Sequence, residues 1–169
     1  MKIARGIIGK MDSVLHIEPV YAHCDYPCGI YDPFDAQLAA HTVIRMQELI
    51  AEINEHAGGK STVEDMHSLV RATEIKEKYA EMCKNELRIL WGDYFKPEHV
   101  QANSNLHELV FTAMKEASKA RQTTDVKTGD ALLEGVMQIA EVFWKTKNIE
   151  SKRVDAPYPT KRKMVLPKL

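Results

Sequence analysis

Four segments of this 169-residue chain repeat apolar residues at steps of three and four, the spacing of one face of an α-helix. They lie at residues 33–57, 63–90, 103–120 and 132–148. No segment shows the strict apolar–polar alternation of a half-buried strand. Short connections between the first and second segments, and between the third and fourth, favour antiparallel neighbours. The sequence therefore predicts an all-α fold, an up-and-down antiparallel four-helix bundle.

Local signals mark the ends of these helices. Asp32-Pro33 is a helix start, and Ser61 with Glu64 matches a capping box in which Ser61 is the cap. In the aromatic connection 91–99, Gly92 and Pro97 argue against an uninterrupted helix. The predicted apolar faces are Leu38, Thr42, Met46, Leu49 and Ile53 in the first helix, Val63, Met66, Val70, Thr73, Ala80, Leu87 and Leu90 in the second, Leu106, Leu109, Val110, Ala113, Met114 and Ala117 in the third, and Leu132, Val136, Ile139 and Phe143 in the fourth.

Charge and composition exclude several classes of protein. The formal net charge is −1, distributed as +1 over residues 1–22, −6 over residues 23–148 and +4 over residues 149–169. A nucleic-acid binder driven by net positive charge is therefore not expected. No apolar run approaches the ~18 residues of a membrane span. Three cysteines exclude a disulfide-stapled scaffold.

Residues 23–33, which we call the hook, concentrate the groups capable of chemistry. They hold His23, Cys24 and Cys28, while Pro27 and Gly29 forbid a helix there. The Cys-x3-Cys spacing differs from the Cys-x2-Cys of zinc knuckles and thioredoxin-type sites. The spacing alone leaves two alternatives open: metal or redox chemistry, and surface thiols without such a role.

Thiolates beside an imidazole suit zinc, copper or nickel. The hook has three such side chains, one fewer than a closed zinc site needs. Cleavage before His23 would add a free α-amine, and the amide nitrogen of Cys24 would complete a planar N2S2 set. That geometry is typical of Ni(II) or Cu(II). Residues 1–22 make a poor export signal, because Lys10, Asp12, His16 and Glu18 interrupt it. A propeptide removed in the cytoplasm fits better than export, and an ordinary N-terminal extension is the alternative that these residues leave open.

The hook sequence His23-Cys24-Asp25-x-Pro27-Cys28-Gly29-x-Tyr31-Asp32-Pro33 resembles the nickel hook of the nickel superoxide dismutase family. The likeness continues in Arg71-Ala72-Thr73, Ile75-Lys76-Glu77, Leu90-Trp91-x-Asp93-Tyr94-Phe95-Lys96-Pro97, Leu106-His107-x-Leu109-Val110 and Phe143-Trp144-x-Thr146-Lys147. It covers residues 23–148 in order, without large gaps.

The resemblance implies an oxidoreductase that cycles Ni(II)/Ni(III) to convert superoxide into oxygen and hydrogen peroxide. It implies one nickel ion per subunit, held by the α-amine and imidazole of His23, the amide nitrogen and thiolate of Cys24, and the thiolate of Cys28. Tyr31 is implied to stand near the open face of the metal, and Asp25 and Tyr94 to help form the substrate pocket. A homo-hexamer, and a maturation peptidase that removes residues 1–22, are implied as well.

The sequence departs from the family at two positions. Some members orient the axial imidazole with an acidic residue and an arginine, where this chain has Ala39 and Tyr79. Competing functions are a nickel-binding or metallochaperone module without turnover, a helical scaffold that has lost its metal, and a thiol–disulfide role. We expect Lys96 to attract the anionic substrate locally and Cys83 to be a buried core thiol. The basic extension 149–169 is expected to be a flexible tail or an arm on a neighbouring subunit.

Overall fold

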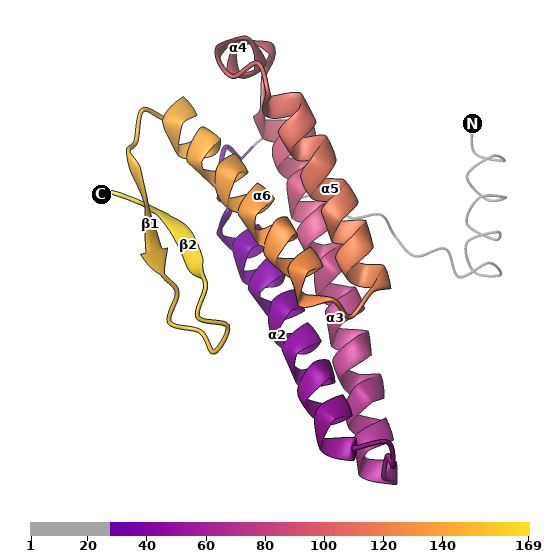
Figure 1. Cartoon of the computed structure of the whole chain (residues 1–169). Helices are drawn as coiled ribbons and strands as arrows, with labels where there is room; N and C mark the ends of the chain where they lie inside the picture. The colour runs from indigo at the N-terminus through magenta and orange to yellow at the C-terminus, as the bar shows by residue number, and fades with distance from the viewer. Residues whose placement is uncertain (1–27) are drawn as a thin grey trace, which may run out of the picture.

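The computed structural model describes residues 28–169 and is mostly helical (Figure 1). The long helices are α2 (Phe34–Ala57), α3 (Val63–Ile89), α5 (Leu106–Gln122) and α6 (Val126–Thr146). The shorter elements are the π-helix η1 (Leu90–Tyr94), α4 (Pro97–Ala102), and the strands β1 (Ser151–Asp155) and β2 (Lys163–Pro167). Within residues 28–169, no helix combines the length and the apolar character that a membrane crossing requires.

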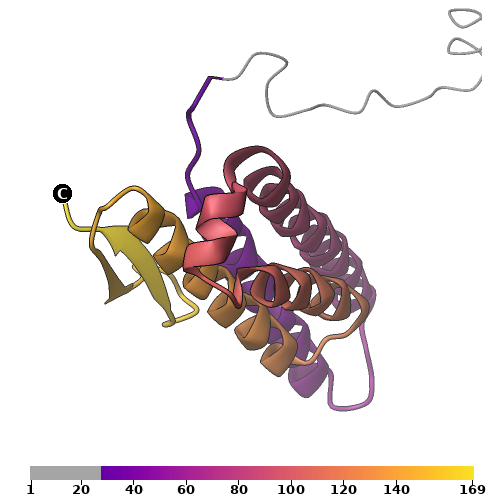
Figure 2. The same cartoon turned by 90° about the horizontal axis from the view of Figure 1, so that it is seen from above.

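The four long helices, which we call the helical body, pack side by side around one core. α2 contacts α3 and α6, and α5 contacts the same two helices. The ends of α2 and α3 that meet at the turn 58–62 extend past α5 and α6 (Figure 1). The short helix α4 lies across the opposite end of the helical body, which Figure 2 shows from above.

Both predicted helix starts lie close to the observed ones. The Asp32 carboxylate accepts the N–H of Phe34 at 2.8 Å, as expected of a residue that caps the first turn. The predicted capping box is wrong by one residue. Thr62, not Ser61, is the cap: its hydroxyl accepts the N–H of Asp65 at 3.1 Å, and Asp65 accepts the N–H of Thr62 at 2.9 Å.

The predicted core faces are correct for α6 and need correction for α2 and α3. Leu132, Val136, Ile139 and Phe143 are all fully buried. In α2 the predicted row is only half-buried. The core-facing residues of α2 are instead Ala36, Ala39, Ala40, Val43, Ile44 and Ile50. In α3, Val63, Met66 and Val70 are exposed, because this part of the helix projects beyond α5 and α6.

Lys76 is a buried charge that holds the end of another helix. Its side chain is 2% exposed, and its ammonium group donates to the carbonyl oxygens of Ala120 at 3.3 Å, Arg121, and Thr123 at 2.8 Å. These carbonyls lie at the C-terminus of α5, where a helix leaves acceptors unpaired and carries partial negative charge. Lys76 on α3 thus fixes the end of α5. Burial lowers the pKa of Lys76 from its ordinary value.

We expect Lys76→Met to lower the free energy of unfolding by about 2–3 kcal/mol, the range of hydrogen bonds to a charged group. Methionine fills a similar volume but leaves the three carbonyls without their donor. Urea unfolding followed by circular dichroism measures the loss. Lys84→Met on the same helix is the control, since Lys84 donates one hydrogen bond, to Ser118, and should lose about 1 kcal/mol or less. Equal losses in the two variants would contradict this assignment.

The C-terminal segment contradicts the prediction of a strand-free chain with a flexible tail or an extended arm. β1 and β2 form an antiparallel hairpin in which Arg153 faces Val165. This hairpin, residues 151–167, packs beside α6 and α2 of its own chain (Figure 2). The sequence does not predict these strands because each has only five residues and carries lysine or arginine. No clear alternation of apolar and polar residues therefore develops.

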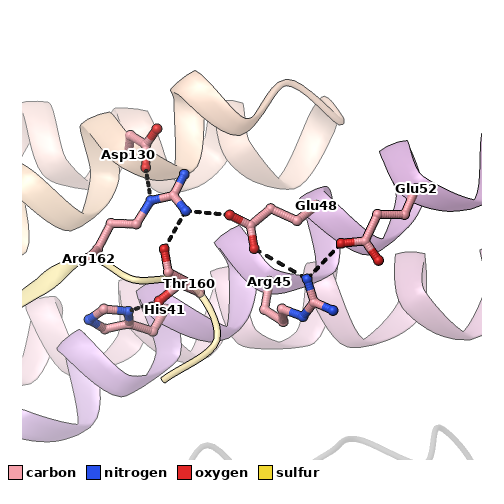
Figure 3. A network of polar contacts seen from close by, with 7 residues as sticks. All are labelled: His41, Arg45, Glu48, Glu52, Asp130, Thr160 and Arg162. Carbon is pink, nitrogen blue, oxygen red and sulfur yellow. Dashed lines mark hydrogen bonds and ion pairs between the residues drawn. The ribbon is translucent and has the colours of Figure 1, made fainter. Parts of the chain in front are cut away.

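Two buried side chains of α2 hold the hairpin. The Gln37 side-chain amide donates to the Val165 carbonyl at 3.1 Å and accepts the Val165 N–H at 2.6 Å, as a neighbouring strand would do. His41 Nδ1 lies 2.8 Å from the Thr160 hydroxyl (Figure 3). Burial lowers the pKa of His41, which favours the neutral imidazole.

An ion-pair network surrounds the same contact (Figure 3). Arg162 of the hairpin pairs with Glu48 on α2 and, at 3.0 Å, with Asp130 on α6. Glu48 also lies 3.5 Å from Arg45, which pairs with Glu52 at 2.9 Å. One guanidinium therefore ties the hairpin to both helices, as a fork of donors permits.

Candidate metal and substrate site

The described part of the hook folds back on the Cys28 sulfur. Cys28 is exposed, and its Sγ accepts the N–H of Ile30 at 3.5 Å. Between them, Gly29 has φ +71°, a conformation that glycine adopts without steric cost. The same sulfur lies 4.0 Å from the Ile30 carbonyl oxygen, so both polar backbone groups of Ile30 approach it. Cys28 thus presents an accessible sulfur, a soft donor of the kind that nickel, copper and zinc bind.

The other predicted ligands, His23 and Cys24, and the predicted pocket residue Asp25 lie outside the described residues. Within residues 28–169, no group of three or more histidine, cysteine or carboxylate side chains could hold a metal ion. Of the three predicted side-chain ligands, the described residues contain Cys28 alone. A second thiolate with nitrogen donors from His23 and Cys24 fits nickel by the chemistry of the ligands.

The structure brings together the two tyrosines that the sequence singled out. Tyr31, just before α2, and Tyr94, in η1, have ring centroids 5.5 Å apart with the planes tilted by 51°. Both rings are half-buried and pack against the core of the helical body. They lie at the end of the helical body from which the hook departs. The phenol rings of Tyr31 and Tyr94 thus lie at the end of the helical body where the hook joins α2.

The π-helix η1 sets the position of Tyr94. The N–H of Phe95 donates to the carbonyl of Leu90 at 2.9 Å, five residues back, and this wide turn ends α3. π turns are rare and recur at functional sites. Gly92 lies within the turn, and Pro97 starts α4, as the predicted interruption requires. Phe95 is buried, so the aromatic connection packs into its own core.

Residues from α6 and α4 surround the Tyr94 ring. Phe143 lies 4.6 Å away between centroids, and His99 stacks at 5.6 Å. The Tyr94 hydroxyl lies 2.6 Å from the Thr146 hydroxyl, and the Lys147 ammonium is 5.2 Å from the ring centroid. The sequence reading gave Thr146 and Lys147 no role. The one sequence feature that places Thr146 and Lys147 beside Phe143 is their helical spacing of three and four residues from it.

The charges around the site are asymmetric. A cleft of about 190 Å³ beside Tyr31 carries three carboxylates. Its lining residues are Ile30, Tyr31, Asp32, Asp35, Glu86, Ile89 and Leu90. Positive charge lies on the Tyr94 side, where Lys147 stands over the ring and Lys96 is exposed. Since like charges repel, a small anion is favoured on the Tyr94 side and disfavoured at the cleft.

The two departures from the family pattern have different surroundings. Ala39 is 1% exposed within the core, and its methyl group offers no hydrogen bond. Tyr79 on α3 is half-buried against the same core and carries a hydroxyl. Of the two, only Tyr79 has a group able to orient an imidazole.

Comparison with known proteins gives consistent results. The family model for nickel-containing superoxide dismutase matches residues 18–147. Superoxide dismutase [Ni] of Streptomyces seoulensis is 44% identical over 128 residues, covering 76% of this chain and 90% of that protein. The same enzyme of Streptomyces coelicolor is 42% identical over equal shares. A crystal structure of Ni-containing superoxide dismutase with ligation corresponding to the oxidized state matches at TM-score 0.66 and 43% identity, over 75% of this chain and 99% of that one.

The C-terminal hairpin lies outside this likeness. The family match ends at residue 147, and β1 begins at Ser151. The hairpin and its contacts with Gln37, His41 and Glu48 are therefore additions to the part of the chain that the family model matches.

Proposed function

Because the chain belongs to the nickel-containing superoxide dismutase family, we propose that it disproportionates superoxide with residues 23–148 as the catalytic unit. Two superoxide anions and two protons give one molecule each of oxygen and hydrogen peroxide. The observation that carries this proposal is the meeting of Tyr31 and Tyr94 beside the start of the hook, within a match that spans the helical body. The chain is an oxidoreductase, and its cofactor is nickel.

The proposed ligands are the α-amine and imidazole of His23, the amide nitrogen and thiolate of Cys24, and the Cys28 thiolate. When bound, nickel supplies the reversible one-electron change between Ni(II) and Ni(III). The exposure of Cys28 supports this assignment, since a metal ion needs an accessible sulfur. Tyr79 is proposed to stand in for the missing imidazole partner.

Protons and substrate position come from the chain itself. Tyr31 and Tyr94 hold superoxide or an ordered water between the hook and η1, and Asp25 completes the pocket. Lys147 and Lys96 attract the anion on the Tyr94 side, which offsets the carboxylates at the cleft. Both tyrosine hydroxyls act as positioning groups, and at least one of them takes part in proton transfer.

Assay of the processed, nickel-loaded chain tests the function. Superoxide decay after pulse radiolysis should accelerate in proportion to bound nickel. The metallochaperone alternative expects nickel to bind tightly with no faster decay. Full nickel occupancy without catalysis would therefore overturn the proposal.

Tyr31→Phe should slow turnover mildly and keep the nickel content, because the hydroxyl is not a ligand. Tyr94 partly substitutes by holding the same water, so the pair Tyr31→Phe with Tyr94→Phe should lose more than either single variant. The upper range is about 10²–10⁴-fold, as for an essential acid–base group. Metal analysis and stopped-flow kinetics measure both effects. Wild-type kinetics in the double variant would remove both hydroxyls from the reaction.

The assembly and maturation of the family are proposed for this chain as well. The helical body is the up-and-down antiparallel four-helix bundle of a homo-hexamer. A peptidase removes residues 1–22, and the enzyme works in the cytoplasm. The exposed stripe of Val63, Met66 and Val70 on α3 supports association, since it is an apolar surface in the single chain.

Sedimentation of the processed chain should give about six times the mass of one subunit. The aromatic connection 91–99 adds no support for association, because Phe95 is buried in its own chain. Val70→Glu on the exposed stripe should weaken the assembly, whereas Glu74→Gln nearby should not. An active, nickel-bound monomer would contradict the expected hexamer.

A further inference from the structure

Two consecutive hydrogen bonds fix the direction of the Tyr94 hydroxyl. The Thr146 hydroxyl donates to the Phe143 carbonyl at 2.7 Å, one turn earlier in α6. A carbonyl has no proton to give, and a threonine hydroxyl has only one. In the second contact, Tyr94 and Thr146 lie 2.6 Å apart. Since the Thr146 proton is already committed, Tyr94 has to be the donor.

The Tyr94 hydroxyl therefore presents only its lone pairs to the rest of its surroundings. An acceptor of this kind attracts a water molecule or a protonated oxygen species and repels the lone pairs of an anion. The positive charge nearest to the Tyr94 ring comes from Lys147, the residue after Thr146. The C-terminal end of α6 thus supplies both the hydrogen-bond acceptor for Tyr94 and a cation over its ring.

We propose that Thr146 is a positioning residue that holds Tyr94 as a hydrogen-bond acceptor toward the substrate side. The inference rests on the proposed function and divides the roles of the two tyrosines. Tyr94 anchors a water or a protonated product, and protons are delivered by Tyr31 or by solvent. Phe143, which packs 4.6 Å from the Tyr94 ring and accepts from Thr146, belongs to the same unit.

The first test needs no metal and uses the full chain. The tyrosine doublet in ultraviolet resonance Raman spectra distinguishes a phenol that donates a hydrogen bond from one that accepts. Subtracting the Tyr94→Phe spectrum isolates Tyr94. We expect a donor signature in the wild type, its loss in Thr146→Val, and its retention in Thr146→Ser. A wild-type difference spectrum in which Tyr94 accepts a hydrogen bond without donating one would overturn the proposal even if Thr146→Val failed to fold.

The second test measures catalysis by the processed, nickel-loaded enzyme. Thr146→Val should reduce turnover by up to about tenfold, the range of one hydrogen bond, and Thr146→Ser should restore it. The same change in a Tyr94→Phe background should have no further effect, because Thr146 acts through that hydroxyl. An equal loss in both backgrounds would assign Thr146 a merely structural role.

Thr42→Val is the matched control. Thr42 also donates to a carbonyl of its own helix, that of Leu38 at 3.0 Å, but it lies on α2 beside the hairpin. It should change neither the Raman difference nor the rate. If the wild type itself fails to disproportionate superoxide, the proposed function falls, while the Raman comparison still decides how Thr146 orients Tyr94.

Discussion

Replacing Cys28 with serine should abolish nickel binding and catalysis together. A serine hydroxyl stays protonated near neutral pH and is a hard, poor donor to nickel. Even outer-sphere changes at metal sites cost about 10–100-fold, so loss of a ligand should exceed 100-fold. Elemental analysis and superoxide decay measure the two losses. Cys24→Ser should behave in the same way.

Cys83→Ser is the internal control for this experiment. The Cys83 thiol is fully buried, lies 3.4 Å from the Ala36 carbonyl as its donor, and has a pKa raised to about 12 by burial. It therefore remains a protonated core group. We expect nearly normal nickel content and turnover, with a stability cost of about 1 kcal/mol. Near-normal turnover in either hook variant would exclude the thiolate mechanism.

A chain that retains residues 1–22 should be inactive. In that chain the His23 nitrogen is part of a peptide bond, so ligation by a terminal amine is impossible. Expression with and without the leader, with each product verified by mass spectrometry, allows direct comparison of activity at equal nickel supply. We expect activity at background in the uncut chain and full activity after cleavage before His23.

A single retained residue makes this test sharper. A chain that begins at Ala22 differs from the mature chain by one small residue, yet its amine is displaced by a whole peptide unit. It should be as inactive as the uncut chain. Full activity with Ala22 present would show that the terminal amine is not needed.

Helical periodicity was a sufficient guide to the number and order of the long helices, but not to every buried face. In α6 the predicted row is the core, since one side of that helix carries the large apolar residues. α2 is covered twice, by the helical body and by the hairpin. Leu38 and Met46 therefore face the hairpin side, while the alanines together with Val43, Ile44 and Ile50 face the core. Periodicity alone does not tell which neighbour each face meets. The capping box shifted by one residue because Ser61-Thr62 offers two adjacent hydroxyls with a carboxylate three residues after each.

The sequence predicted those parts of the candidate site that depend only on which residues are present. The hook residues and the two tyrosines stand in recognisable order, and the structure shows Tyr31 and Tyr94 in contact. The role of Thr146 was not readable, because it follows from two distances and from the single proton of a hydroxyl. The same limit applies to Lys76, whose three acceptors lie on a different helix.

The hairpin has a consequence for the order of events during synthesis. Gln37 receives its hydrogen-bond partner from Val165, 128 residues later in the chain. The N-terminal part of a chain leaves the ribosome first. The four long helices therefore emerge before Val165, the residue that binds Gln37 in the first turn of α2. The base of the hook therefore acquires its final support last, once the chain is nearly complete. Until then α2 near Gln37 should exchange its amide protons faster than the centre of the helix, as a segment awaiting a distant partner does.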